Sequence, residues 1–240
     1  MKQSNILLVV LSINLLAGIY ITDRLLAQQY LKINLDDPYK NFDFQAVQPF
    51  KALRITGGNG YAIRIMQGKN FSVRVMHSRK SFFSMNASND TLAIGFTVAN
   101  QQYQRPEQST VGLIITVPHL TFIQLSGTNN EINEFYEDTI TIQQDKNTVT
   151  RLKDLQVDCL TLQGSGISYF DFLQKNKVGN LTVHLQNTAS TNFHQVSFQQ
   201  FKPVLQDSAA IILYRQSLEL LKLPDSTSNS SKIRQAKSDL

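Results

Sequence analysis

The sequence is poor in residues that cross-link a chain or ligate metals. Its 240 residues include no tryptophan, four histidines and a single cysteine, and only 17% of them are charged. One cysteine excludes an internal disulfide. Because free cysteine is among the most buried residue types, we expect Cys159, at a strand position, to be buried packing. Most polarity comes instead from glutamine, asparagine, serine and threonine, which is typical of solvated β surfaces.

Processing signals are also missing around the N-terminal apolar run, which covers residues 6–22. As a helix this run would span about 25 Å, within the range of membrane-crossing segments. No Ala-x-Ala cleavage site follows it, and Ile19 stands where a lipoprotein would carry its lipidated cysteine. We therefore expect an uncleaved anchor with the rest of the chain outside the cytoplasm. The alternative is a cleaved signal peptide.

A repeat of about 20 residues dominates the second half of the chain. Aliphatic anchors recur at spacings of 19, 20, 21 and 21 residues, at Ile123, Ile142, Leu162, Val183 and Val204. Ten residues after each anchor stand Asn133, Leu152, Phe172, Phe193 and Tyr214, four of them large and apolar. Turn-forming pairs follow the anchors at Ser126-Gly127, Asp145-Lys146, Ser165-Gly166, Gln186-Asn187 and Asp207-Ser208. The pattern predicts a single-stranded parallel β-helix, a solenoid of about five rungs over 119–218.

A period of two marks the residues before this repeat. Leu53 and Ile55, and later Ile63 and Ile65, alternate with polar or small residues. Turn residues at 57–60 and 67–70 predict β-hairpins and therefore an antiparallel sheet. We thus expect an all-β protein behind one transmembrane helix, divided into an anchor or signal (1–22), a spacer (23–49), an antiparallel sheet (50–118), a β-solenoid (119–223) and a disordered tail (224–240).

Positive charge is concentrated at the start of the β region. Residues 50–80 contain seven basic residues and no aspartate or glutamate. Hairpins with three-residue loops would set Arg54 opposite Arg64, and Arg64 opposite Arg74, on the solvent face, where like charges destabilise a sheet. Two explanations stay open. The long side chains fan apart into water, or the three arginines form an anion-binding face for acidic glycan or anionic lipid headgroups.

Several strand sequences resemble those of a known family. Leu53-Arg-Ile-Thr-Gly, Ile115-Thr-Val-Pro-His-Leu and Leu160-Thr-Leu-Gln-Gly-Ser-Gly are similar to motifs of the putative auto-transporter adhesin head family, also called the GIN domain. The similarity covers roughly residues 50–218. It implies an exported bacterial β-solenoid, typical of Bacteroidota, with no established activity. With the anchor, it implies a single-pass protein of the inner membrane whose β domain lies in the periplasm; a cleaved signal would give a secreted or cell-surface protein.

Candidate catalytic chemistry is sparse. No histidine stands at a metal-ligand spacing from cysteine, aspartate or glutamate, so we predict no metal site, no cofactor and no catalytic residue. Ser165 lacks the full Gly-x-Ser-x-Gly elbow. Asp145 and Asp207 are expected in one column, three rungs and about 14 Å apart, which is too far for a carboxylate pair on one glycosidic bond.

The sequence therefore predicts a non-enzymatic adhesion or binding module of the cell envelope. Its expected partners are envelope glycan, anionic lipid headgroups or another envelope protein, together with the membrane through residues 6–22. Nucleic acid is not expected, because the domain is exported. The alternatives are a carbohydrate-active β-helix enzyme acting on acidic polysaccharide and a purely structural component of the envelope.

Overall fold

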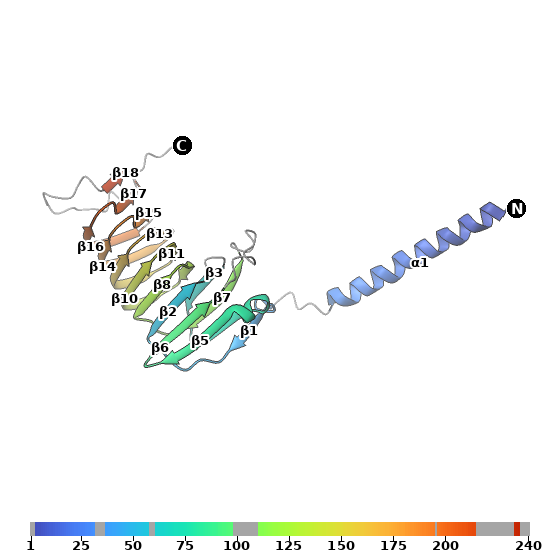
Figure 1. The fold of residues 1–240 in the computed structure, drawn as a ribbon, viewed down its shortest axis with the longest axis horizontal. Helices are drawn as coiled ribbons and strands as arrows, with labels where there is room; N and C mark the ends of the chain where they lie inside the picture. Colours follow the sequence, from blue (N-terminus) through green and yellow to red (C-terminus); the bar gives the residue numbers. More distant parts are fainter. Residues whose placement is uncertain are drawn as a thin grey trace. The chain divides into compact units, whose positions relative to one another are not determined.

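The computed structural model describes residues 3–31, 37–57, 61–97, 110–194, 196–214 and 233–235. The chain forms two compact units, Met1–Asn41 and Phe42–Leu240. The first unit contains helix α1 (Gln3–Leu31) and the second contains all the strands (Figure 1).

Helix α1 is longer than the apolar run that predicted it. Its segment Val9–Tyr30 has a mean hydropathy of 1.6 over the most apolar window and is long and apolar enough to cross a membrane, by length and composition. Its described side chains are exposed within their own unit. Because leucine, alanine and glutamine favour helix and no proline or glycine interrupts residues 19–31, the helix continues through Arg24 to Leu31.

The β unit consists of two sheets. The eight-stranded sheet has the order β16-β14-β12-β10-β8-β2-β6-β5 (Figure 1). Its strands are β2 (Ala52–Gly57), β5 (Phe83–Ser88), β6 (Thr91–Phe96), β8 (Phe122–Ser126), β10 (Tyr136–Asp145), β12 (Gln156–Gly164), β14 (Asn176–Leu185) and β16 (Val196–Leu205). Along most of these strands buried and solvent-facing residues alternate, so one face of the sheet lies on the core.

The ten-stranded sheet has the order β1-β4-β7-β3-β9-β11-β13-β15-β17-β18. Its strands are β1 (Phe42–Gln45), β3 (Ala62–Gln67), β4 (Ser72–Met76), β7 (Val111–Val117), β9 (Asn129–Asn133), β11 (Thr148–Lys153), β13 (Ser168–Phe172), β15 (Ser190–Phe193), β17 (Ala210–Leu213) and β18 (Ile233–Gln235). A short 3-10 helix, η1 (His77–Phe82), links β4 to β5.

From β8 to β17 the chain alternates between the sheets, and each strand pairs in parallel with the strand about 20 residues away. The predicted repeat is therefore present as parallel pairing. The fold as a whole is a mixed two-sheet arrangement, because β1, β4 and β5 make antiparallel pairs. The sequence predicted a parallel solenoid that follows a separate antiparallel sheet. In the structure the strands of residues 50–118 belong to the same two sheets as the repeat.

The predicted hairpins of residues 50–80 are wrong. β2 belongs to the eight-stranded sheet and pairs in parallel with β6 and β8, whereas β3 belongs to the other sheet and pairs in parallel with β7 and β9. β4 does lie in the same sheet as β3, but β7 separates them. The period of two was correct because alternation depends only on which face is buried. It does not depend on the partner strand.

The predicted columns hold in the middle of the repeat and fail at its ends. Ile123, Ile142, Leu162 and Val183 are direct neighbours in the eight-stranded sheet. The next position is Pro203, not Val204, so the last anchor was misplaced by one residue. Val204 is 41% exposed as a result. The first and last members of the second column are likewise Ile132 and Leu213, in place of Asn133 and Tyr214.

Aromatic side chains fill the core at the C-terminal end of the stack. Phe172 and Phe193 are fully buried neighbours on β13 and β15, with ring centroids 4.9 Å apart. Phe193 also contacts Phe201 of β16, at 5.7 Å in an edge-on arrangement. The contact between Phe193 and Phe201 therefore joins the two sheets.

Left-handed residues form the corners between the sheets. Gly127, Lys146, Gly166, Asn187 and Asp207 all have φ between 54° and 65°. They lie within the five predicted turn pairs, which places the corners correctly. Glycine and asparagine adopt this conformation with little strain. Lys146 adopts it because β10 before it and β11 after it are each held by pairing in their own sheet.

Two smaller expectations are also corrected. Cys159 is partly exposed, since Val157 and Leu160 both face the core and leave two residues between them on the outside. Of the tail predicted to be disordered, residues 233–235 form β18, which pairs in parallel with β17. The remainder of 224–240 lies outside the described residues.

Candidate functional site

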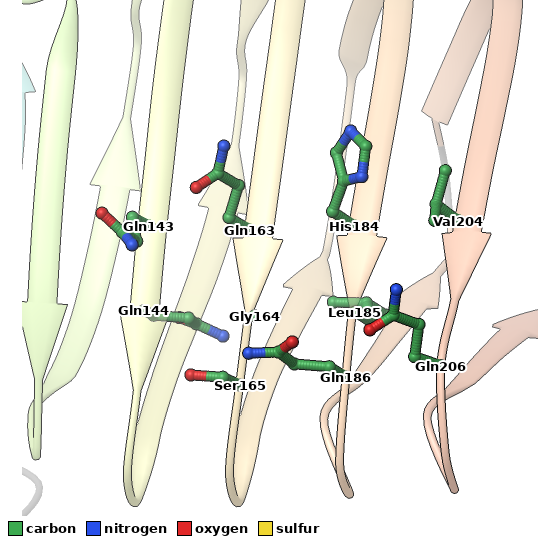
Figure 2. Close-up of a pocket in the computed structure, with 10 residues that line it drawn as sticks. All are labelled: Gln143, Gln144, Gln163, Gly164, Ser165, His184, Leu185, Gln186, Val204 and Gln206. Carbon is green, nitrogen blue, oxygen red and sulfur yellow. The ribbon is translucent and has the colours of Figure 1, made fainter.

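An open groove crosses the outer face of the eight-stranded sheet near the ends of β10, β12, β14 and β16. Its volume is about 330 Å³. The lining residues are Gln143, Gln144, Gln163, Gly164, Ser165, His184, Leu185, Gln186, Val204 and Gln206 (Figure 2). Glutamine therefore accounts for half of the lining.

Two rows of outward side chains border the groove. In the first row, Gln143, Gln163 and His184 are direct neighbours on adjacent parallel strands, and Val204 continues the row. The second row lies two residues further along each strand, at the corner, and contains Ser165, Gln186 and Gln206 (Figure 2). The rows are about 6.7 Å apart along each strand, and their members follow one another every 4.8 Å or so.

The floor of the groove is backbone whose hydrogen bonds are already made. The carbonyls of Gln144, Gly164 and Leu185 accept from the amides of the corner residues of the next strand, at 2.9–3.0 Å. The side chain of Gln144 turns into the core, where its Oε1 accepts from Thr150 at 2.7 Å. A ligand in the groove must therefore bond to side chains.

The carboxamides along the groove are available for such bonds. Within the described part of the chain, no hydrogen bond involves the side chain of Gln143, Gln163, Gln186 or Gln206. Each carboxamide offers two N–H donors and one carbonyl acceptor. No charged side chain is among the described residues that line the groove. The site therefore presents paired donors and acceptors without a net charge.

The three arginines of the expected anion-binding face do not lie together. Arg54 is on the eight-stranded sheet, where its Nε donates to Gln124 Oε1 at 2.8 Å. Arg64 and Arg74 are on the ten-stranded sheet, on either side of buried Ile114. The predicted arginine pairs are wrong because β2, β3 and β4 are not consecutive neighbours. The long arginine stems instead flank an apolar residue.

Charges of both signs alternate along the outer face of the ten-stranded sheet. Arg64, Glu131, Arg151 and Asp171 occupy matching positions on β3, β9, β11 and β13. Arg64 Nη2 lies 3.6 Å from Glu131 Oε2, and Arg151 Nη1 donates to Asn129 Oδ1 at 2.8 Å. The negative charge beside Arg64 is that of Glu131 on β9, a later strand, because residues 50–80 contain no aspartate or glutamate.

The end of this charged row is a cluster of mutually bonded groups. His194 Nε2 lies 3.2 Å from Asp171 Oδ1, and the His194 ring stacks on Tyr214 with centroids 4.0 Å apart. Asn192 Nδ2 donates to the Tyr169 hydroxyl. Burial, with the Asp171 carboxylate beside it, raises the pKa of Tyr169 above its usual range. Because these groups bond to one another, we do not place the binding site here.

Acidic groups do not form a catalytic pair at the groove. Asp145 lies in the row of Ser126 and Ser165, at the β10 end of the second row but not among the residues that line the groove, whereas Asp207 occupies the left-handed corner position and accepts from the Asn187 amide at 3.1 Å. The expectation of one shared column was wrong by the same one-residue shift as the last anchor. Among the described residues, no group of three His, Cys, Asp or Glu side chains could hold a metal ion.

Sequence reasoning missed the groove, although its signal was present. Glutamine or histidine follows four of the five predicted anchors, at Gln124, Gln143, Gln163 and His184. In a parallel stack such residues form a ladder on one outer face. Only the structure shows that the ladder is bordered by a second row and that the carboxamides of Gln143 and Gln163 make no hydrogen bond, whereas Gln124 accepts one from Arg54.

The fold defines a class of two-sheet β proteins that has been seen in solved structures. No family model and no curated protein matches the sequence. A putative adhesin from Bacteroides fragilis matches with a TM-score of 0.54 and 11% identity, over 74% of this chain and 81% of that one. A putative adhesin from Parabacteroides merdae matches with a TM-score of 0.50 and 13% identity, over 72% and 80%.

A protein from Parabacteroides distasonis described as a putative lipid binding protein has a TM-score of 0.46 and 10% identity, over 73% of this chain and 82% of that one. At these identities the first two similarities show the fold alone.

Proposed function

We propose that this protein is a non-catalytic binding module of a bacterial cell envelope. Helix α1 holds it in the inner membrane, and the β unit, a β-solenoid of the adhesin head type, extends into the periplasm. The observation that carries the proposal is the groove. It is open, crosses four parallel strands and presents unbonded carboxamides. These groups are open to solvent, so a ligand can replace the water that is bonded to them.

The chemistry of the groove favours binding over catalysis. Hydrolysis of a glycosidic bond needs two carboxyl groups about 5–10 Å apart on either side of the bond. The groove contains amides, an imidazole and a hydroxyl, and no carboxylate lines it within the described residues. The fold similarity to two proteins described as putative adhesins and the motif resemblance support the same assignment.

A bulky substitution in the groove tests the binding role. Full-length protein in liposomes should retain at least one polysaccharide from a panel of neutral and acidic polymers, measured by co-flotation. Gln163→Trp should abolish most of that retention, because an indole at this exposed position fills the middle of the groove. Gln200→Trp, at an exposed glutamine of β16 outside the groove, should bind as wild type does. Equal retention by both variants, or none by wild type, contradicts the proposal.

The anchor makes a separate prediction. We expect the mature protein to keep its N-terminal segment, because no cleavage or lipidation motif borders residues 6–22. Intact-mass spectrometry of the membrane fraction should therefore give a mass close to 27.1 kDa. A smaller mass, with a new N-terminus near residue 20–28 and the protein in the soluble fraction, would show signal cleavage instead.

A further inference from the structure

We infer that the groove binds a neutral, linear, hydroxyl-rich chain, an uncharged glycan, lying across the strands. This inference rests on the proposed binding function and identifies the class of ligand. Its first basis is charge. No lysine, arginine, aspartate or glutamate is among the described residues that line the groove. An acidic polymer would lose its hydration there without gaining a charge-assisted bond.

The second basis is the match of donors and acceptors. A sugar hydroxyl both donates and accepts, and so does a carboxamide. Gln163 lies in the middle of the first row, and Gln186 faces the same groove from the second row (Figure 2). A chain of sugars between the rows can therefore bond on both of its edges. Anionic lipid headgroups need the cationic donors that this groove lacks.

The third basis excludes an added peptide strand. A peptide that extends a sheet bonds to free backbone groups at an edge. Here the floor carbonyls of Gln144, Gly164 and Leu185 already accept from neighbouring strands. The groove also runs across the strands, whereas an added strand would run along them. Recognition through side chains alone fits a ligand that carries its own hydroxyls.

The spacing of the strands sets the length of the ligand. From β10 to β16 there are three strand intervals, which is about 14 Å. A pyranose unit in a β-1,4-linked chain advances by nearly one strand interval. Successive sugars therefore meet successive strands, and about four sugars fill the groove. Longer chains add no further contacts.

The test is calorimetric titration of the full chain in lipid nanodiscs, because maltoside detergents would present competing sugars. The probes are β-1,4-linked glucose oligomers from two to eight units and galacturonic acid oligomers of equal length. We expect neutral oligomers to bind with an affinity that rises with length to about four units and then stays constant. Binding should not weaken when salt is raised, since no ion pair is involved.

Variants assign the binding to the groove. Gln163→Ala should weaken the binding of the neutral tetramer about 2- to 10-fold, the value of one or two neutral hydrogen bonds. Gln206→Ala, at one end of the groove, should move the plateau to a shorter oligomer. Gln200→Ala is the matched control and should have no effect. Unchanged binding in both groove variants overturns the inference.

The other outcomes separate this inference from the proposed function. Tighter, salt-sensitive binding of the galacturonic acid oligomers overturns the neutral class but leaves a binding module. Polysaccharide retention on liposomes without binding of any short oligomer overturns the linear-glycan inference alone. Failure of both assays contradicts the proposed function as well.

Discussion

Replacing Phe193 by alanine should lower the free energy of unfolding by about 3–5 kcal/mol. The side chain is fully buried, and its ring contacts Phe172 and Phe201, at 4.9 and 5.7 Å between centroids. β15 is held on both sides by β13 and β17. The strands therefore cannot close around the cavity that the substitution leaves, and most of the lost packing stays lost. Urea unfolding of the full chain, followed by circular dichroism, measures the change.

An exposed phenylalanine provides the control. Phe44 of β1 is 60% exposed. Its replacement by alanine should cost less than about 1 kcal/mol, since little apolar surface is buried there. Phe172→Ala should resemble Phe193→Ala, because the two rings occupy one column. If both core variants keep the wild-type midpoint, the aromatic column does not hold the sheets together.

Replacing Gly57 by alanine is expected to cost about 2–4 kcal/mol, for two reasons that add. Gly57 ends β2 with φ at +79°, in the left-handed region that alanine adopts with strain. A Cβ there would also overlap the carbonyl oxygen of Phe96, its register partner on β6. That carbonyl belongs to the backbone of a sheet strand, so it cannot turn away as a flexible side chain would.

Gly127 separates these two contributions. It has φ at +63°, but a Cβ on it would meet no atom within 4 Å. Gly127→Ala should therefore cost only the conformational strain, about 1–2 kcal/mol. Thermal unfolding of both variants in parallel gives the difference, which we attribute to the overlap with Phe96. Equal losses in the two variants would mean that β2 and β6 do not approach each other as closely as the structure shows.

The period of the sequence determined the middle of the repeat. Ile142, Leu162 and Val183 form one column of neighbours. Ten residues after each of them, Leu152, Phe172 and Phe193 form the second column. Such columns can be predicted because every repeat buries the same face. The ends failed by one residue, since Pro203 takes the core-facing register and puts Val204 outside.

Pairing partners in residues 50–118 were decided only by the tertiary structure. Alternation at Leu53 and Ile55 indicates a strand with one buried face, and that signal is the same for parallel and antiparallel neighbours. The chain places β2 between β6 and β8, two strands that lie far from it in sequence. Turn residues near Gly57 mark a corner between sheets as readily as a hairpin, so local sequence cannot distinguish the two.

The same distinction explains the charges and the groove. The sequence determined that Arg64 is a solvent-facing residue of a strand. The tertiary structure decided that Glu131 lies beside it, because β9 arrives from nearly 70 residues away. Likewise the sequence determined a glutamine at the same place in successive repeats. Whether those amides bond to one another or stay open to a ligand depends on side-chain positions across strands, which no single repeat specifies.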